Sequence, residues 1–299
     1  MAGLDDLITE ARAHDAGADY DLRPTRELVD RMAREDATVP AAVDAAGDEI
    51  ALVVDAVVDR LASGGRLIYV GAGSSGRIAA LDAYECAATF GAPAGQVVAI
   101  VAGEGARSPL EQEAAEDDRG AGAQALRELG AGAADAVVGV SASGRTPYVL
   151  GALEVAAAAG AVTAALVSAR GSELARIAQH ELAVVVGPEF VAGSTRLKAG
   201  TAQKLVLNTI STVAMIRLGK TFGDLMVDVV ATNEKLRARA ARIVGTVTGA
   251  SGADAEQALA AANGSAKVAI VSLLGGVDAE TARSRLDAAD GNIRLAVSG

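Results

Sequence analysis

The sequence predicts an α/β fold in which a parallel sheet lies between two layers of helices, with a small all-helical module at the C-terminus. Short apolar runs alternate with helical segments through most of the chain, which is the pattern of a parallel sheet covered on both faces. Two of these runs lead into turns of small residues that open a helix. From about Thr246 the apolar runs give way to short helical segments separated by glycine.

The composition narrows the classes of function. The 299 residues are enough for one large domain and a smaller module. A net charge of −11 disfavours nonspecific binding to nucleic acid or to an anionic membrane. Cys86 is the only cysteine, and His14 and His180 lie far apart, which excludes a multi-cysteine metal site and a histidine pair at helical spacing. Without a signal peptide or an uninterrupted membrane-spanning stretch, we expect a cytoplasmic location.

The elements are expected in a regular order. The arm over 1–39 is polar and less regular, and apolar residues at helical spacing predict one long amphipathic helix over 40–61. Apolar runs then predict strands at 66–70, 96–102, 135–140, 161–167 and 181–187. Long helices are expected over 195–220 and within 228–245, and Asp278 is placed to cap a helix of the tail. We predict three parts: an arm over 1–39, an α/β domain over 40–230 and a helical extension over 231–299.

The first candidate loop lies in "LIYVGAGSSGRIAALDA". Its Gly71, Gly73 and Gly76 match the dinucleotide fingerprint G-x-G-x-x-G. Backbone N–H groups and the positive end of the helix dipole converge at such a turn, where Ser74 and Ser75 add hydroxyl donors. The glycine spacing alone fits NAD, another phosphorylated ligand or a purely structural turn.

The second candidate loop, in "VVGVSASGRTPYVLGALE", again connects an apolar strand to a helix. Three hydroxyl side chains surround this turn, at Ser141, Ser143 and Thr146. They flank Gly144, and Pro147 suits the first turn of the helix that follows. One such turn is compatible with simple helix capping, but two in one sheet indicate a polyhydroxylated phosphate ester. NAD is disfavoured, because the acidic residue of its fingerprint should come about twenty residues after the glycines and Glu104 comes later.

The loops "GAGSSGR" and "SASGRTPY" resemble those of the sugar isomerase domain, whose members bind phosphosugars in a flavodoxin-like, three-layer fold. Longer stretches are similar to the N-acetylmuramic acid 6-phosphate etherase family: "GAGSSGRIAALDAYEC", "GPEFVAGSTRLKAGTAQKLVLNTIS" and "MIRLGKTFGDLMVDVVATNEKLRARAARIV". The resemblance covers about 40–244. More loosely, the tail is similar to the small ubiquitin-associated-like module of that family.

The resemblance implies a cytoplasmic, cofactor-free lyase, usually a homodimer. Its substrate would be N-acetylmuramic acid 6-phosphate, whose lactyl ether is cleaved to N-acetylglucosamine 6-phosphate and D-lactate in cell-wall sugar recycling. By position in the motifs, Glu85 matches the acid/base glutamate of the family and Glu116 its second catalytic glutamate. Candidate substrate-binding residues lie in the two loops and at the start of the later long helix, where capping is the alternative role: Ser74, Ser75, Gly76, Ser141, Ser143, Gly144, Thr146, Ser194, Thr195 and Lys198.

The implied chemistry suits carboxylates. An ether oxygen is a poor leaving group, so direct displacement at carbon 3 of the sugar would be slow. Ring opening exposes an aldehyde at carbon 1, which acidifies the proton on carbon 2 and makes lactate a β leaving group. Elimination followed by water addition then needs a base at carbon 2 and an acid at the departing oxygen. One or two carboxylates supply both roles without a metal, and which glutamate has which role stays open.

Both glutamates also have structural interpretations. Glu116 lies in an acidic run of the kind that usually forms a solvated helix face, and Glu85 also suits an ion pair at a subunit contact. If the helix that includes Ser75 is unbroken, Glu85 lies roughly 15 Å from its start, farther than the reactive carbons are from the phosphate. Either the helix ends early or a neighbouring chain supplies one of the groups, as in a homodimer with a shared active site. Cys86 is expected to be buried rather than to act as a nucleophile.

The chain departs from the family pattern in two places. Alanines at 87–88 stand where the family usually has two prolines, so the local turn is expected to differ. The arm keeps Thr9, Glu10 and Arg12 but has Ala13 in place of an asparagine. That substitution leaves open both the contact of the arm with the substrate and the strict identity of the substrate.

Two other functions are compatible with the sequence. An aldose–ketose phosphosugar isomerase also begins by removing the proton on carbon 2, and a phosphosugar-sensing regulator binds its ligand without turnover. Release of D-lactate separates the etherase from both. No basic DNA-binding segment supports a transcriptional form of the regulator.

Overall fold

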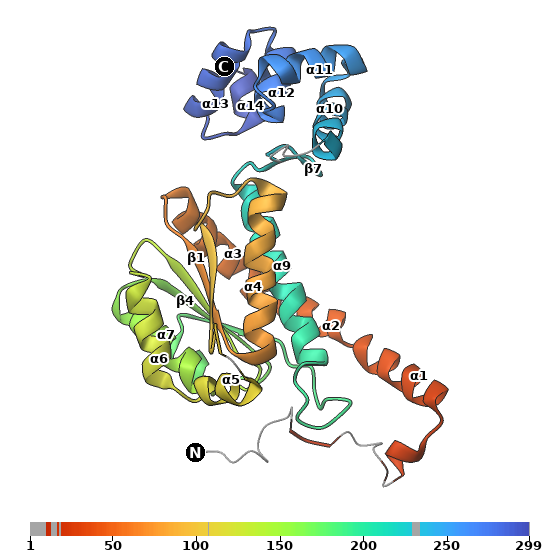
Figure 1. Ribbon diagram of the computed structural model, residues 1–299, viewed down its shortest axis with the longest axis vertical. Coiled ribbons are helices and arrows are strands. Elements are labelled where there is room, and N and C mark those ends of the chain that lie inside the picture. Colours follow the sequence, from red (N-terminus) through yellow and green to blue (C-terminus); the bar gives the residue numbers. More distant parts are fainter. Residues whose placement is uncertain (1–9, 13–16, 18, 107, 229–233, 299) are drawn as a thin grey trace. The chain divides into compact units, whose positions relative to one another are not determined.

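The computed structural model describes residues 10–12, 17, 19–106, 108–228 and 234–298 (Figure 1). The chain divides into two compact units, of which the first comprises residues 1–83 and 95–211. The second comprises residues 84–94 and 212–299. The domain boundaries that we place at residues 39 and 230 stay predictions.

The first unit is built on a five-stranded parallel sheet with the order β2-β1-β3-β4-β5. The strands are β1 (Leu67–Gly71), β2 (Val97–Val101), β3 (Ala136–Val140), β4 (Val162–Val167) and β5 (His180–Ala183). β1, β3 and β4 are buried along their whole length, as expected for a sheet covered on both faces. The predicted α/β class is confirmed, and this strand order is that of flavodoxin-like folds.

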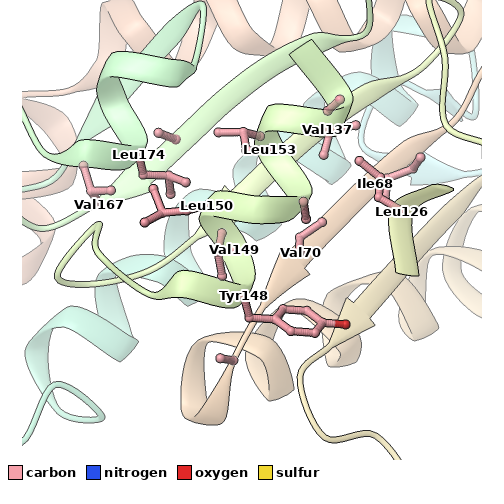
Figure 2. Packing of buried hydrophobic residues seen from close by; sticks show 14 of the residues in the cluster. Ile68, Val70, Leu126, Val137, Tyr148, Val149, Leu150, Leu153, Val167 and Leu174 are labelled. Carbon is pink, nitrogen blue, oxygen red and sulfur yellow. The ribbon is translucent and has the colours of Figure 1, made fainter. Parts of the chain in front are cut away.

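Helices cover both faces of the sheet. The helices that begin in this unit are α1 (Thr25–Asp36), α2 (Val39–Asp44), α3 (Gly47–Ala62), α4 (Gly73–Phe90), α5 (Pro109–Glu116), α6 (Arg119–Glu128), α7 (Pro147–Ala158), α8 (Glu173–Ile177) and α9 (Lys198–Arg217). α3 packs on one face and α7 on the other, and both contact β1, β3 and β4 (Figure 1). Figure 2 shows the aliphatic core beneath α7, which includes Ile68, Val70, Val137, Leu150, Leu153 and Val167.

The N-terminal helices differ from the sequence expectation. The helix predicted over 40–61 is two helices, because the backbone leaves the helical conformation at Ala46 (φ −104°, ψ 14°) and its N–H donates to the carbonyl of Val43. The arm contains α1, which has no buried side chain. Within the arm, Glu27 accepts hydrogen bonds from Arg23 and Arg31, each four residues away. Such pairs stabilise a helix that buries no side chain.

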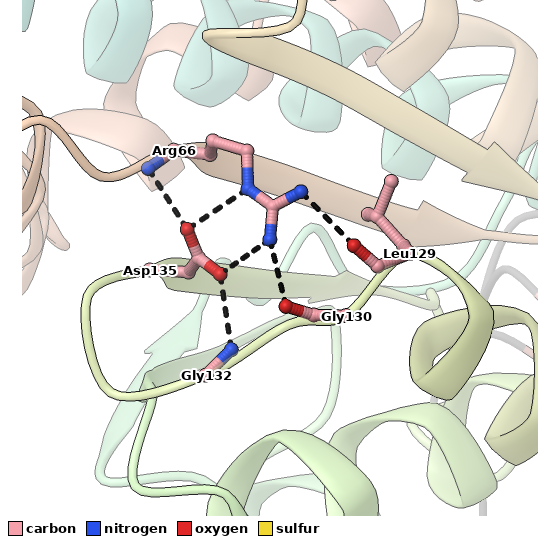
Figure 3. A network of polar contacts seen from close by, with 5 residues as sticks. All are labelled: Arg66, Leu129, Gly130, Gly132 and Asp135. Atoms are coloured by element: carbon pink, nitrogen blue, oxygen red, sulfur yellow. Dashed lines mark hydrogen bonds and ion pairs between the residues drawn. The ribbon is translucent and has the colours of Figure 1, made fainter.

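A partly buried ion pair joins the chain before β1 to the chain before β3 (Figure 3). The guanidinium of Arg66 donates to both carboxylate oxygens of Asp135, at 3.0 and 2.8 Å, and to the carbonyls of Leu129 and Gly130. The backbone N–H groups of Arg66 and Gly132 also donate to Asp135. Burial alone would raise the pKa of Asp135, but these hydrogen bonds outweigh it and lower the pKa.

We expect Asp135→Ala to lower the free energy of unfolding by about 3 kcal/mol at neutral pH, because the guanidinium loses its partner in a mostly buried site. Since the folded-state pKa of Asp135 is lowered, this stabilisation is complete above the unfolded-state value of about 4 and is lost as the pH falls through the folded-state value. Urea denaturation of both proteins over a pH series measures the difference. Asp55→Ala, at an exposed position on α3, is the control. If the difference in the free energy of unfolding between the unmodified protein and Asp135→Ala does not narrow as the pH is lowered, this account is contradicted.

The second unit contains the helical tail. Its elements are the antiparallel strands β6 (Thr221–Phe222) and β7 (Leu225–Met226) and the helices α10 (Glu234–Thr248), α11 (Gly252–Ala261), α12 (Ala266–Gly275), α13 (Ala279–Ala288) and α14 (Ile293–Ser298). A second apolar cluster, including Val244, Ile270 and Ile293, holds these helices together. The carboxylate of Asp278 accepts the N–H of Thr281 at 2.7 Å, so the predicted cap is confirmed.

Over the described ranges no single helix has the length and apolarity to cross a membrane, and only the bent pair α11 and α12 passes that test jointly.

Candidate active site

The two small-residue turns lie side by side at the carboxyl edge of the sheet. β1 is flanked by β2 and β3, and Gly71 at its end is in register with Val140 at the end of β3. The strand order therefore reverses at this point. In open parallel sheets, ligands bind in the crevice outside the strand ends at such a reversal.

A pocket of about 570 Å³ opens at this point. Six of the candidate substrate-binding residues line it: Ser74, Ser75, Ser141, Ser143, Thr146 and Thr195. Glu116 lines it as well. The other candidates do not: Gly76, Gly144, Ser194, Lys198 and Glu85. The geometry thus gathers hydroxyls from three separate segments around one candidate catalytic carboxylate.

The glycines of the first loop allow α4 to start close against the end of β1. A Cβ on Gly76 would lie 2.7 Å from Val101 and 2.9 Å from the backbone of Gly71, so a larger residue does not fit without movement. Gly73 has φ +52°, and a Cβ there would lie 2.7 Å from Oε1 of Glu116. The fingerprint spacing therefore serves helix–strand packing, and it also lets Glu116 approach the first turn of α4.

The second loop forms a compact hydroxyl cluster. Ser141 Oγ lies 2.8 Å from Thr146 Oγ1 and 3.5 Å from Ser143 Oγ, and it accepts the N–H of Gly144. Pro147 lies in the first turn of α7, as predicted. Thr146 occupies the N-cap position, but its side chain makes no capping hydrogen bond. Capping therefore does not account for this hydroxyl, which instead lines the pocket.

The start of α9 is held by two carboxylates, Glu189 and Glu35. The carboxylate of Glu189, 1% exposed, accepts the N–H groups of Lys198 and Ala199 at 2.9 and 3.0 Å. Nζ of Lys198 lies 2.5 Å from Oε2 of Glu35 on α1, and its side chain is buried. Lys198 is thus engaged in an ion pair, whereas Thr195 lines the pocket. Nothing in the sequence marked Glu189, because its partners come nine and ten residues later.

Glu116 has the electrostatics of a proton-transfer group. It ends α5 and is partly buried. Burial raises the pKa of its carboxyl, Asp117 and Glu113 raise it further, and Arg77 opposes them. A raised carboxyl pKa in a pocket is typical of general acids and bases that work near neutral pH.

We expect Asp117→Asn to lower the pKa of Glu116, because it removes a neighbouring negative charge that does not line the pocket. The limb of the pH–rate profile that Glu116 controls should move to lower pH, whether Glu116 acts as acid or as base. Asp117→Glu keeps the charge and is the matched control. A limb that stays in place in Asp117→Asn, or moves equally in both variants, would contradict this assignment.

Glu85 lies on an unbroken helix. α4 runs from Gly73 to Phe90, and the alanines at 87–88 continue it, so the alternative that the helix ends early is wrong. Glu85 is exposed and lies twelve residues after Gly73, about 18 Å along a helix. The remaining alternative is that a neighbouring chain supplies one of the two glutamates. Cys86 is buried, as predicted.

Several pocket residues were missing from the sequence prediction. Glu10, noted only as part of the arm, lines the pocket, and its Oε2 would lie 2.5 Å from a Cβ on Gly193. Arg77 and Arg145 line it too, and Arg77 donates to Oε1 of Gln112 at 2.8 Å. A signal for the arginines was present, because each ends a Ser-Gly-Arg triplet, once in each loop.

Thr9 and Ala13 of the arm lie outside the described residues. Within the described part of the chain, no three His, Cys, Asp or Glu side chains are grouped to hold a metal ion.

Comparisons with known proteins agree with this fold. Residues 49–157 match the family model described as the glucokinase regulatory protein N-terminal SIS domain, that is, a sugar isomerase domain. A phosphoheptose isomerase from Francisella tularensis has a similar fold, with a TM-score of 0.52 and 19% identity, over 65% of this chain and 100% of that one. At this identity the likeness shows the fold alone.

Closer relatives span nearly the whole chain. The N-acetylmuramic acid 6-phosphate etherase of Rubrobacter xylanophilus is 56% identical over 294 residues, covering 98% of this chain and 97% of its own. The protein of the same name from Streptomyces avermitilis is 53% identical over 298 residues, covering 100% of this chain and 96% of its own. The resemblance drawn from the two loops and the longer motifs is confirmed: the chain belongs to the N-acetylmuramic acid 6-phosphate etherase family.

Proposed function

We propose that this protein cleaves the D-lactyl ether of N-acetylmuramic acid 6-phosphate, giving N-acetylglucosamine 6-phosphate and D-lactate, in the recycling of cell-wall amino sugars. The observation that carries the proposal is the pocket in which the carboxylate of Glu116 lies beside two hydroxyl-rich loops. Relatives with 46–56% identity bear the corresponding name. Because phosphosugars do not cross membranes freely, we place the reaction in the cytoplasm.

The phosphate of the substrate is held mainly by the second loop. Ser141, Ser143 and Thr146 offer hydroxyl donors from one compact cluster, and Arg145 adds a positive charge. The start of α7 follows directly, so its helix dipole favours an anion here. Ser74 and Ser75 at the start of α4 extend this set of donors across the pocket.

The reaction proceeds by elimination and water addition. After ring opening, a base removes the proton from carbon 2 while the bond between carbon 3 and the ether oxygen breaks. An acid protonates that oxygen, which leaves as the hydroxyl group of lactate. Water then adds its hydroxyl to carbon 3 and a proton returns to carbon 2. Glu116 is one proton-transfer group, since it lines the pocket beside Gly73 and its pKa is raised by burial and by the charges of Asp117 and Glu113.

The second group, Glu85, acts from another copy of the chain. Its position, about 18 Å along α4 from Gly73, is too far from the end of the pocket where Glu116 approaches Gly73 for both glutamates of one chain to reach carbons 2 and 3 of one sugar. Its exposure on α4 suits contact with a partner. We therefore propose a homodimer in which each site combines Glu116 of one chain with Glu85 of the other.

Release of D-lactate tests the proposed function. The purified protein is incubated with N-acetylmuramic acid 6-phosphate, and D-lactate is measured with a D-lactate dehydrogenase. We expect turnover without added metal or nucleotide. Formation of a ketose phosphate from an aldose phosphate would instead indicate an isomerase, and saturable binding without any product would indicate a sensor.

A further inference from the structure

The substrate and the sugar product differ in charge. N-Acetylmuramic acid 6-phosphate carries a phosphate and a lactyl carboxylate, whereas N-acetylglucosamine 6-phosphate carries the phosphate alone. The pocket is lined by two guanidinium groups, Arg145 from the second loop and Arg77 from the first turns of α4. We propose that Arg77 binds the lactyl carboxylate and so distinguishes substrate from product. This inference rests on the proposed function.

The neighbours of Arg145 suit the phosphate. Arg145 belongs to the same loop as the hydroxyl cluster of Ser141, Ser143 and Thr146, and no carboxylate lies in that loop. A phosphate dianion is best placed among such donors and away from negative side chains. The phosphate therefore occupies the Arg145 side of the pocket.

The neighbours of Arg77 place it at the reacting end. Its Nη2 donates to Gln112 Oε1 at 2.8 Å, which places the guanidinium beside α5, the helix that carries Glu116. Its charge also opposes the rise in the pKa of Glu116, so the two groups are close enough to interact. Glu116 in turn approaches Gly73 in the first turn of α4. Arg77 and the proposed proton-transfer carboxylate thus face the same part of the ligand.

The chemistry of the substrate brings the lactyl carboxylate to this position. A group that takes the proton from carbon 2, or that protonates the ether oxygen on carbon 3, lies close to that oxygen. The carbon of the lactyl carboxylate is two bonds from the same oxygen. There it meets Glu113 and Glu116, whose charges repel it. A guanidinium offsets this repulsion and matches the two carboxylate oxygens with paired donors.

Kinetics with substrate and product separate this role from phosphate binding. For Arg77→Gln we expect kcat/KM for N-acetylmuramic acid 6-phosphate to fall about 10- to 100-fold, the range for losing a hydrogen bond to a charged group. The inhibition constant of N-acetylglucosamine 6-phosphate should stay unchanged, which also shows that the variant is folded. Arg145→Gln is the matched control and should weaken both ligands. Rates are compared on the plateau of each pH profile, because Arg77 also affects the pKa of Glu116.

Other outcomes would overturn the inference. If Arg77→Gln weakens substrate and product equally, Arg77 holds the phosphate. If it changes neither, Arg77 is not a ligand. In both cases D-lactate release by the unmodified protein leaves the proposed function intact. If the unmodified protein releases no D-lactate, the proposed function fails and this inference fails with it.

Discussion

Replacing Glu116 by glutamine is expected to lower kcat for D-lactate release by about 10²–10⁴-fold, the usual contribution of one general acid or base. Glutamine has the same shape and still fits beside Gly73, but it neither takes up nor gives the proton. Because the group acts in the transition state, KM should change little. Initial rates over a range of substrate concentrations give both constants.

Glu113→Gln is the stringent control for Glu116. Glu113 is also a carboxylate of α5 and also lines the pocket. It lies about one helical turn before Glu116. We expect it to affect the rate only modestly, through the pKa of Glu116. The role of Glu116 would be refuted if Glu116→Gln kept normal turnover. It would also be refuted if Glu113→Gln lowered kcat as much as Glu116→Gln does.

Replacing Glu85 by glutamine is expected to cause a loss of similar size, about 10²–10⁴-fold in kcat, and this loss should be rescued in mixed dimers. When Glu85→Gln and Glu116→Gln chains are unfolded and refolded together, half of the dimers contain one chain of each kind. Each mixed dimer has one site with both glutamates intact. The equimolar mixture should therefore regain about a quarter of the unmodified activity, given a twofold-symmetric dimer.

The same experiment carries its own controls. Each variant refolded alone should stay inactive, and the unmodified protein refolded alone gives the reference rate. If both glutamates of a site come from one chain, every site in the mixture lacks one of them and no activity returns. That result would overturn the shared site and would require α4 to deliver Glu85 to the pocket of its own chain.

The sequence predicted the sheet and the two loops because their signals are local. Apolar runs of strand length are visible in a single stretch, and so are the turn residues around Gly73 and Gly144. Asp278 could be identified as a cap from the helical segment that follows it. The break between α2 and α3 escaped prediction, since an unbroken apolar period runs through Ala46 and carries no sign of it.

The missing parts of the site depend on segments that meet only in the fold. Glu10 reaches the pocket from the N-terminal arm, and Gln112 is placed against Arg77 by the packing of α5. The ion pair between Lys198 and Glu35 joins residues 163 positions apart. Periodicity and turn chemistry contain no information about such contacts, so the sequence presents Lys198 as a candidate ligand and carries no sign of Glu189.

The most direct test of the account is the fate of solvent oxygen. The protein is incubated with N-acetylmuramic acid 6-phosphate in ¹⁸O-labelled water, and both products are analysed by mass spectrometry with fragmentation of the sugar. Elimination followed by water addition predicts unlabelled hydroxyl oxygen in D-lactate and one ¹⁸O at carbon 3 of N-acetylglucosamine 6-phosphate. Label in the lactate hydroxyl would show cleavage on the other side of the ether oxygen. That result, or saturable binding without D-lactate, would contradict the account.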